Sequence, residues 1–186
     1  IENVPEDLVI KAGVYQTIDG LIGPATIVAS DTSGIPITKL QEHISHPERM
    51  VGMHWSNPPH IIPMIEVIGG ARTAPETVAA IRDLIRSLGL LPVVLKKDVP
   101  GFVENRVLYA LLREAVDLVE RGVIEPEDLD TCVSWGIGYK LAVVGPMALL
   151  DMAGLDIYQS VSSFLNADLC SRNDVTKLVV EKTVAA

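Results

Sequence analysis

Cysteine, aromatic residues and long apolar runs are all scarce in this chain. Aromatic side chains make up 4% of the 186 residues, so aliphatic side chains must build the core. The 2 cysteines, Cys132 and Cys170, have no metal-ligand spacing, and no disulfide framework is expected. No apolar run approaches the roughly 18 residues that span a bilayer, and nothing resembles a signal peptide. We therefore expect a soluble protein of the reducing cytoplasm, without a membrane partner.

Basic charge is also in deficit. The formal net charge is −9, which argues against nucleic acid as a partner, because phosphates require basic patches. Hydrophobic residues make up 48% of the chain and charged residues 21%, which is typical of a folded protein with one or two small domains.

Helical and strand patterns alternate in the first half of the chain. Proline and two acidic residues at positions 5–7 predict a helix start, because proline suits the first turn and acids favour its positive end. Further helices are predicted at residues 36–44 and 74–88. Short apolar runs predict strands at residues 26–29, 50–54, 64–68 and 92–95. This alternation predicts an α/β fold with a mostly parallel, doubly wound sheet.

The second half shows helical patterns alone. The change comes near residue 98, and helices are predicted to begin at Phe102, Pro126, Pro146, Asp156 and Ser171. The sequence therefore predicts an α/β domain at residues 1–98, followed by an all-α domain at residues 99–186.

One motif of α/β nucleotide-binding proteins is missing. A complete Rossmann-type domain opens with a strand, a Gly-x-Gly-x-x-Gly turn and a helix that holds the cofactor's pyrophosphate. Gly69-Gly70 and Gly136-x-Gly138 lack these surroundings. We therefore interpret residues 1–98 as the C-terminal part of such a domain, whose first half is expected ahead of Ile1. The chain by itself should bind a dinucleotide weakly.

The residues with the strongest chemical signature are His54 and, twelve positions later, Glu66. Histidine transfers protons near neutral pH, and a carboxylate on its second ring nitrogen fixes its tautomer and raises its basicity. Two adjacent strands can bring the two side chains together, facing a cleft. Alternatively, His54 is a strand-end histidine bonded to backbone, and Glu66 is a surface residue.

Two further segments stand beside this pair. Ser30-Asp31-Thr32-Ser33 follows a predicted strand, where α/β proteins bind ligands, and Pro100-Gly101-Phe102-Val103-Glu104-Asn105-Arg106 opens the long helix. Taken singly, Ser33 suits a turn or a helix cap, and Asn105 is an ordinary helix residue. In this order and spacing, with Gly52-x-His54 and Asn57-Pro58, the segments resemble the signature of the 3-hydroxyacyl-CoA dehydrogenase family across essentially the whole chain.

The resemblance implies a mechanism and a set of site residues. His54 would be the general base, oriented by Glu66, and Ser33 and Asn105 would hydrogen-bond the reacting oxygen. Glu6, Lys11, Ser33 and Asn57 match positions that contact the nicotinamide half of NAD. The helical domain would form a homodimer; a simple helical cap is the alternative.

Three departures from the family pattern indicate a small polar substrate in place of acyl-CoA. Asp31 replaces an asparagine, Trp55-Ser56 replaces a pair of phenylalanines, and the segment 136–146 is longer than in acyl-CoA enzymes. These segments are similar to a family branch that oxidises a pyridine aldehyde carboxylate in vitamin B6 degradation. Trp55 would stack on the ring, and Arg106 or Lys140 would pair with the carboxylate. A structural tryptophan and solvated cations are the alternatives.

An aldehyde substrate raises the question of a cysteine nucleophile. Neither Cys132 nor Cys170 lies in a segment that the family places at its active site. The hydrated aldehyde is a geminal diol, which His54 could deprotonate as it would an alcohol. Two other interpretations stay open: a 3-hydroxybutyryl-CoA or other small hydroxy-acid dehydrogenase, and a non-catalytic relative. The presence of His54, Glu66, Ser33 and Asn105 argues against the last.

Overall fold

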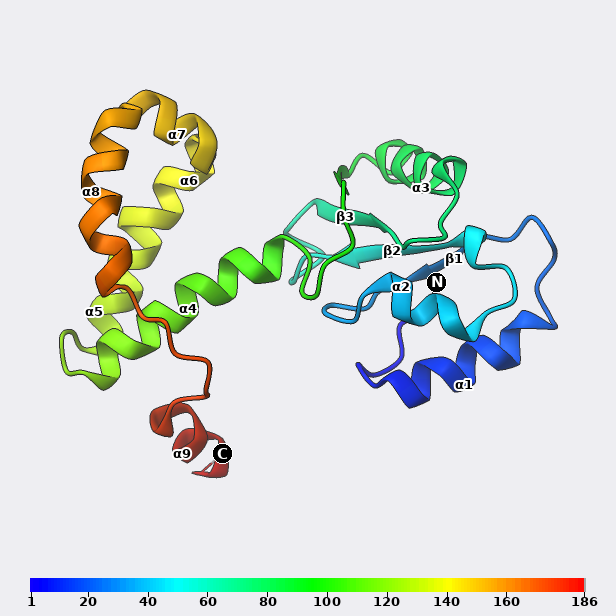
Figure 1. The fold of residues 1–186 in the computed structure, drawn as a ribbon, viewed down its shortest axis with the longest axis horizontal. Coiled ribbons are helices and arrows are strands. Elements are labelled where there is room, and N and C mark those ends of the chain that lie inside the picture. The colour runs from blue at the N-terminus through cyan, green and yellow to red at the C-terminus, as the bar shows by residue number, and fades with distance from the viewer. Residues whose placement is uncertain (186) are drawn as a thin grey trace. The chain divides into compact units, whose positions relative to one another are not determined.

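The computed structural model describes residues 1–185 and divides into two compact units, Ile1–Leu108 and Tyr109–Ala186. The first unit combines a sheet with helices, and the second is helical (Figure 1). The predicted fold class, an α/β region followed by an all-α region, is confirmed.

The sheet has four strands in the order β1-β2-β3-β4: Val28–Ser30, Met50–Trp55, Met64–Gly69 and Leu91–Leu95. The β1–β2 and β3–β4 pairs are parallel, as predicted for a mostly parallel sheet. The β2–β3 pair is antiparallel, because the chain turns back directly after Trp55 instead of crossing over through a helix. This antiparallel pair carries the site described below.

Helices cover both faces of the sheet. On one face, α1 (Leu8–Asp19) and α2 (Ile37–Leu40) contribute to an apolar cluster, and on the other α3 (Pro75–Ser87) covers a second cluster (Figure 1). Two short 3₁₀ helices, Gln41–His43 and Pro47–Arg49, lead into β2. The first cluster consists of Tyr15, Val28, Ile37, Leu40, Ile44, Met50, Ile68 and Phe102, and the second of Ala29, Val51, Met53, Ile65, Val67, Ile81 and Ile85.

The first helix begins later than proline placement suggests. Asp7, in extended conformation, is the N-cap of α1, and its side chain accepts hydrogen bonds from the amides of Val9 and Ile10. Pro5 therefore lies before the helix. Upstream of Pro5, Glu2 forms a parallel bridge with Ser30 at the edge of β1. A side-chain cap thus decides the helix start, as expected for aspartate.

The helix α4 (Glu104–Glu120) crosses from the first unit into the second. The second unit continues with α5 (Pro126–Thr131), α6 (Tyr139–Val143), α7 (Pro146–Ala153), α8 (Leu155–Asp168) and α9 (Lys177–Ala185). Three details differ from the prediction. The helix α4 begins at Glu104 and not at Phe102, and the last helix begins at Lys177 and not at Ser171. The segment Cys132–Gly138 is a π-helical stretch that continues directly from α5 into α6.

Burial differs sharply between the units. Every buried apolar residue of the described chain lies between Ala12 and Phe102, and Thr176 is the one buried residue described in the second unit. No single described helix has the length and apolarity of a membrane span. One bent pair of helical segments, Pro126–Val143 with Pro146–Ala153, is long and apolar enough for a membrane span by length and composition alone.

Candidate active site

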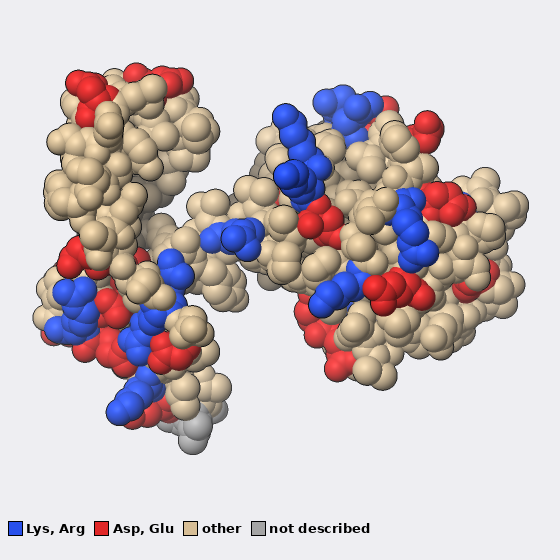
Figure 2. Space-filling view, viewed as in Figure 1, with Lys and Arg blue, Asp and Glu red and all other residues tan. Residues whose placement is uncertain are grey.

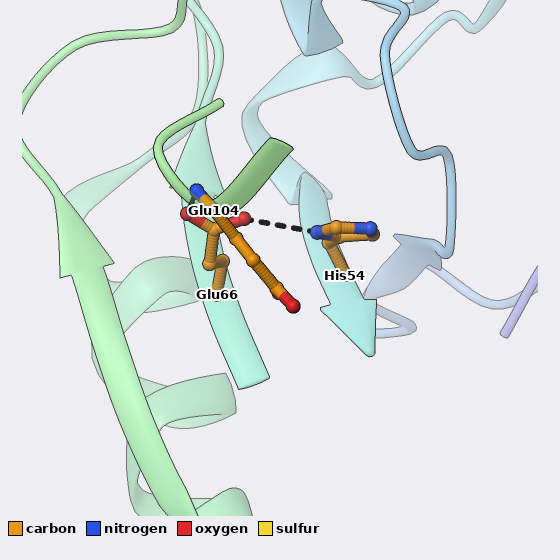
Figure 3. A group of neighbouring side chains, drawn as sticks. All are labelled: His54, Glu66 and Glu104. Atoms are coloured by element: carbon orange, nitrogen blue, oxygen red, sulfur yellow. Dashed lines mark hydrogen bonds and ion pairs between the residues drawn. The ribbon is translucent and has the colours of Figure 1, made fainter. Parts of the chain in front are cut away.

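His54 and Glu66 are direct cross-strand partners in the antiparallel β2–β3 pair. The Nδ1 atom of His54 lies 2.9 Å from Oε2 of Glu66, and both side chains are buried (Figure 3). Since the carboxylate accepts, Nδ1 carries the proton and Nε2 is the basic nitrogen of the neutral ring. The expected contact between the imidazole and the carboxylate is therefore present in the structure.

Glu66 also fixes the start of α4. Its other oxygen, Oε1, accepts hydrogen bonds from the backbone amides of Val103 and Glu104, at 3.0 and 3.1 Å. The turn before the helix makes this approach: Gly101 and Phe102 both have positive φ, which glycine adopts freely and phenylalanine rarely. The Phe102 ring then lies 5.5 Å from the imidazole of His54, measured between ring centroids. One carboxylate thus joins β2, β3 and α4.

The pair is electrostatically coupled. Burial alone would lower the pKa of His54, but the hydrogen bond to Glu66 and the charges of Glu66, Glu104 and Asp31 raise it above the ordinary value. Burial alone would raise the pKa of Glu66, yet the bonds from His54 and from the two amides of α4 lower it. The arrangement therefore stabilises the imidazolium–carboxylate state, which is the state reached after a base accepts a proton.

A third ionisable side chain, Glu104, was not predicted from the sequence. It is the first residue of α4, and one ligand atom each of His54, Glu66 and Glu104 lies within 4.8 Å of the others (Figure 3). The hydroxyl of the buried Ser56 donates a hydrogen bond to its Oε1. A glutamate at a helix start looks like an ordinary N-terminal acid, so the sequence alone held no signal for this contact.

The loop after β1 is held by Glu6. Its Oε1 accepts hydrogen bonds from the hydroxyl of Thr32 and from the amides of Ser33, Gly34 and Ile35. Ser33 is exposed, and its carbonyl oxygen accepts a 2.9 Å hydrogen bond from Nδ2 of Asn105. The structure therefore brings Ser33 and Asn105 together, although their roles toward a reacting oxygen stay a prediction.

Lys11 belongs to a buried polar network. Its Nζ lies 2.8 Å from Glu2 and 3.5 Å from Glu6, and the side chain is 1% exposed. The other oxygen of Glu2 accepts hydrogen bonds from the hydroxyls of Tyr15 and Ser30. Glu2 and Tyr15 were not predicted as site residues, because a lone glutamate near the chain start and a helical tyrosine carry no motif. The ammonium of Lys11 is thus engaged within the protein.

Trp55 points away from His54. It packs against the apolar cluster below α3, and consecutive residues of a strand point to opposite faces of a sheet. Its side chain therefore lies on the face opposite His54, and its stacking on a substrate stays a prediction. Its backbone amide donates a 3.0 Å hydrogen bond to Oδ1 of Asp31. Burial raises the pKa of Asp31.

The remaining predicted residues are exposed. Asn57 follows Ser56 in the loop between β2 and β3, and Arg106 lies in the first turn of α4 with Nη1 3.4 Å from the carbonyl of Pro100. Lys140 lies in α6 of the second unit. Their side chains are accessible to a ligand, and their roles stay predictions.

Comparison with known proteins agrees with this geometry. Residues 1–99 match the family described as 3-hydroxyacyl-CoA dehydrogenase, NAD binding domain, and residues 101–186 match the 3-hydroxyacyl-CoA dehydrogenase, C-terminal domain. A 5-formyl-3-hydroxy-2-methylpyridine 4-carboxylate 5-dehydrogenase of Mesorhizobium japonicum is 84% identical over all 186 residues, which cover 60% of that enzyme. A probable 3-hydroxybutyryl-CoA dehydrogenase of Bacillus subtilis is 37% identical over 91% of the chain, which covers 58% of it.

A solved structure is similar as well. A crystal structure of 5-formyl-3-hydroxy-2-methylpyridine 4-carboxylic acid 5-dehydrogenase, described as an NAD⁺-dependent dismutase, has 85% sequence identity and a TM-score of 0.96. The match covers 99% of this chain and 60% of that one, so the chain spans about three fifths of the length of these relatives. With both halves matched and the two signature side chains in contact, the chain belongs to the 3-hydroxyacyl-CoA dehydrogenase family.

Proposed function

We propose that this chain is the larger part of an NAD-dependent dehydrogenase that oxidises 5-formyl-3-hydroxy-2-methylpyridine-4-carboxylate, as its hydrate, to the 4,5-dicarboxylate. The observation that carries the proposal is the buried contact between Nδ1 of His54 and Glu66, which leaves Nε2 as a base. The 84% identity with the Mesorhizobium japonicum enzyme supports the choice of substrate over an acyl-CoA, since the hydroxybutyryl-CoA relative stands at 37%.

The hydrated aldehyde is a geminal diol and reacts as an alcohol. Nε2 of His54 takes the proton of one hydroxyl, and the C–H bond breaks with its electron pair, so that the carbon becomes a carboxyl group. Bound NAD would supply the acceptor for that hydride. Glu66 holds the imidazole in the required tautomer and stabilises its positive charge as it forms. Ser33 and Asn105 are proposed to hydrogen-bond the reacting oxygen.

The described residues fit the nicotinamide end of the cofactor. Ser33 and Asn57 present exposed polar side chains that can hydrogen-bond a carboxamide, and Glu6 fixes the loop that carries Ser33. Lys11 is proposed to contribute to cofactor binding through its ion pair with Glu6. The 186 residues hold no Gly-x-Gly-x-x-Gly turn for the pyrophosphate, so the activity test uses the chain joined to the part of the Mesorhizobium japonicum enzyme that it does not cover.

Substrate carboxylates require cationic partners. Arg106 is proposed for this role because it is exposed one residue after Asn105, on the first turn of α4. Lys140 is the second proposed cation, supplied by the helical unit. Replacing either with methionine should raise KM more than it lowers kcat, because the charge binds substrate and reacting state alike.

The second unit is proposed to form a homodimer. Its helices expose many large apolar side chains, and α6–α8 show a mostly uncharged surface in Figure 2. A helical unit without buried apolar residues requires a covering surface, and a second copy supplies one of equal character. The large exposed apolar residues of this unit include Tyr109, Trp135, Val143, Met147, Met152, Leu155 and Phe164.

The cytoplasm is the proposed location of the protein, which is consistent with two free cysteines.

The test of the reaction is NADH formation by the extended chain, which is this chain joined to the part of the Mesorhizobium japonicum enzyme that it does not cover. The pyridine aldehyde should support turnover, and His54→Asn should lower kcat by about 10² to 10⁴, the usual contribution of general-base catalysis. Preference for 3-hydroxybutyryl-CoA would overturn the proposed substrate assignment. No turnover with either compound would favour a non-catalytic relative.

A second variant tests the route through the hydrate. Cys132 and Cys170 both lie in the second unit, and the proposed chemistry uses neither thiol. Replacing both with alanine should leave turnover of the aldehyde unchanged. Loss of activity in this variant, with its helical content preserved, would indicate a covalent thiohemiacetal instead.

A further inference from the structure

Glu104 has one oxygen in use and one without a partner. Ser56 donates to Oε1, whereas Oε2 is buried and has no hydrogen-bond partner among the described residues. A buried acceptor without a donor costs free energy, and such atoms in native proteins usually mark a bound water, ion or ligand group. The atom lies on the carboxylate that neighbours His54 and Glu66 (Figure 3).

A cation is the first candidate to consider, since a histidine with two carboxylates can ligate metals. The contacts argue against it. Oε2 of Glu66 is bound to Nδ1 of His54, and Oε1 of Glu66 already accepts two backbone amides. A metal would have to displace the hydrogen bond between His54 and Glu66. A hydroxyl donor needs the free oxygen of Glu104 alone and leaves the hydrogen bonds of Glu66 to His54 and to the α4 amides in place.

We propose that Oε2 of Glu104 accepts a hydrogen bond from the second hydroxyl of the hydrated aldehyde, which makes Glu104 a substrate-binding and specificity-determining residue. The inference rests on the proposed function. A geminal diol has two hydroxyls: His54 takes the proton of one, and the other needs an acceptor close by. A primary alcohol has hydrogen in place of that hydroxyl, so it makes no use of Glu104.

This arrangement favours the hydrate over the free aldehyde. A carboxylate that accepts from a hydroxyl forms a charge-assisted hydrogen bond, which is stronger than one between neutral groups. With both hydroxyls held, by His54 and by Glu104, the remaining C–H bond of the carbon has a fixed direction. The second oxygen comes from water, so no group of the protein is consumed.

The test compares two substrates in the extended chain: the pyridine aldehyde and the corresponding 5-hydroxymethyl alcohol. Above the raised pKa of His54, where its ring is neutral with or without the charge of Glu104, Glu104→Leu should lower kcat/KM for the aldehyde by about 10- to 100-fold, the effect of losing one charge-assisted hydrogen bond. It should change the alcohol reaction by less than about threefold. Glu104→Gln should lose less on the aldehyde, because its amide oxygen still accepts. Glu76→Gln, an exposed glutamate at the start of α3, is the control and should match the unchanged protein. Equal losses on both substrates, or no loss on either, would overturn the proposal.

A measurement without turnover separates this inference from the proposed function. With a ¹³C label on the formyl carbon and no NAD present, binding to the protein should shift the aldehyde–hydrate equilibrium toward the hydrate, and Glu104→Leu should abolish the shift. The imidazole NMR signals of His54 report whether the site is still folded. If the unchanged protein oxidises neither compound, the proposed function fails, while a hydrate shift that depends on Glu104 still supports the binding role. An equilibrium that neither protein shifts would overturn it.

Discussion

The two units of this chain differ in how they are held together. In the first unit, a four-stranded sheet closes an apolar cluster on each face, and buried ion pairs join its segments. The second unit is built from helices alone and has no buried apolar residue among those described. Apolar burial is the main driving force of folding, so the first unit has its own core, while the second exposes the apolar surface for which a second copy is proposed.

The largest expected effect comes from breaking the contact between His54 and Glu66 in the first unit. Glu66→Ala leaves the imidazole of His54 buried without its partner and removes the acceptor of two α4 amides. We expect a loss of about 3–5 kcal/mol in the free energy of unfolding of that unit, measured by urea titration. Glu76→Ala, at an exposed site, should stay within about 0.5 kcal/mol. Similar losses in both variants would refute a central role for Glu66.

The second unit should respond to a surface change that the first tolerates. Phe164→Glu places a charge on the exposed apolar surface of α8 and should weaken the homodimer at least about tenfold, as measured by sedimentation. Leu88→Glu adds the same charge at an exposed apolar residue of the first unit and should leave the dimer dissociation constant from sedimentation unchanged. A monomer at all concentrations, before any substitution, would rule out the second copy as the covering surface.

The stability of the first unit should depend on pH in both directions. The pKa of Glu66 is lowered by folding, so its stabilising contribution is present above the unfolded value of about 4.3 and is lost as the pH falls through the folded one. The pKa of His54 is raised, so its contribution is complete below about 6.5 and is lost as the pH rises through the folded value. Stability from this pair is therefore greatest between these limits.

Urea titrations across pH check this expectation. His54→Gln should remove the alkaline decline, because the group that releases its proton there is gone. An alkaline decline of unchanged size in that variant would assign it to another residue. In the proposed reaction, His54 must be neutral to accept a proton, so kcat/KM for the aldehyde should rise as the pH passes above the raised pKa of His54.

The smallest effect is expected at the first helix. Asp7→Ala removes the side chain that accepts the amides of Val9 and Ile10, and it should cost about 1 kcal/mol. Asp7→Asn keeps an accepting oxygen and should retain most of the stability. A loss of the same size in both variants would show that the charge of Asp7, and not its cap, stabilises α1.

The prediction from sequence succeeded where a local pattern decides the structure. Short apolar runs located all four strands of the described sheet, and proline and glycine located most helix ends. It failed where two local signals compete: Pro5 and Asp7 both suit a helix start, and the side-chain cap of Asp7 prevailed. The π-helical stretch Cys132–Gly138 has no local signature and was not predicted.

Within the site, the sequence identified His54 and Glu66 through their spacing and neighbours, but it gave no reason to choose Glu104. The sequence also gave no indication of the direction in which Trp55 points. Alternation along the strand places its side chain on the face opposite His54.

The sequence by itself determined the family, the α/β and helical halves, and the pairing of His54 with Glu66, because each depends on residues close together or on motifs in a fixed order. Only the tertiary structure decided that β2 and β3 run antiparallel, that Glu66 caps α4, and that Glu104 has a free oxygen beside the pair. These features depend on contacts between residues 12 to 48 positions apart, and chain packing, not local preference, sets such contacts.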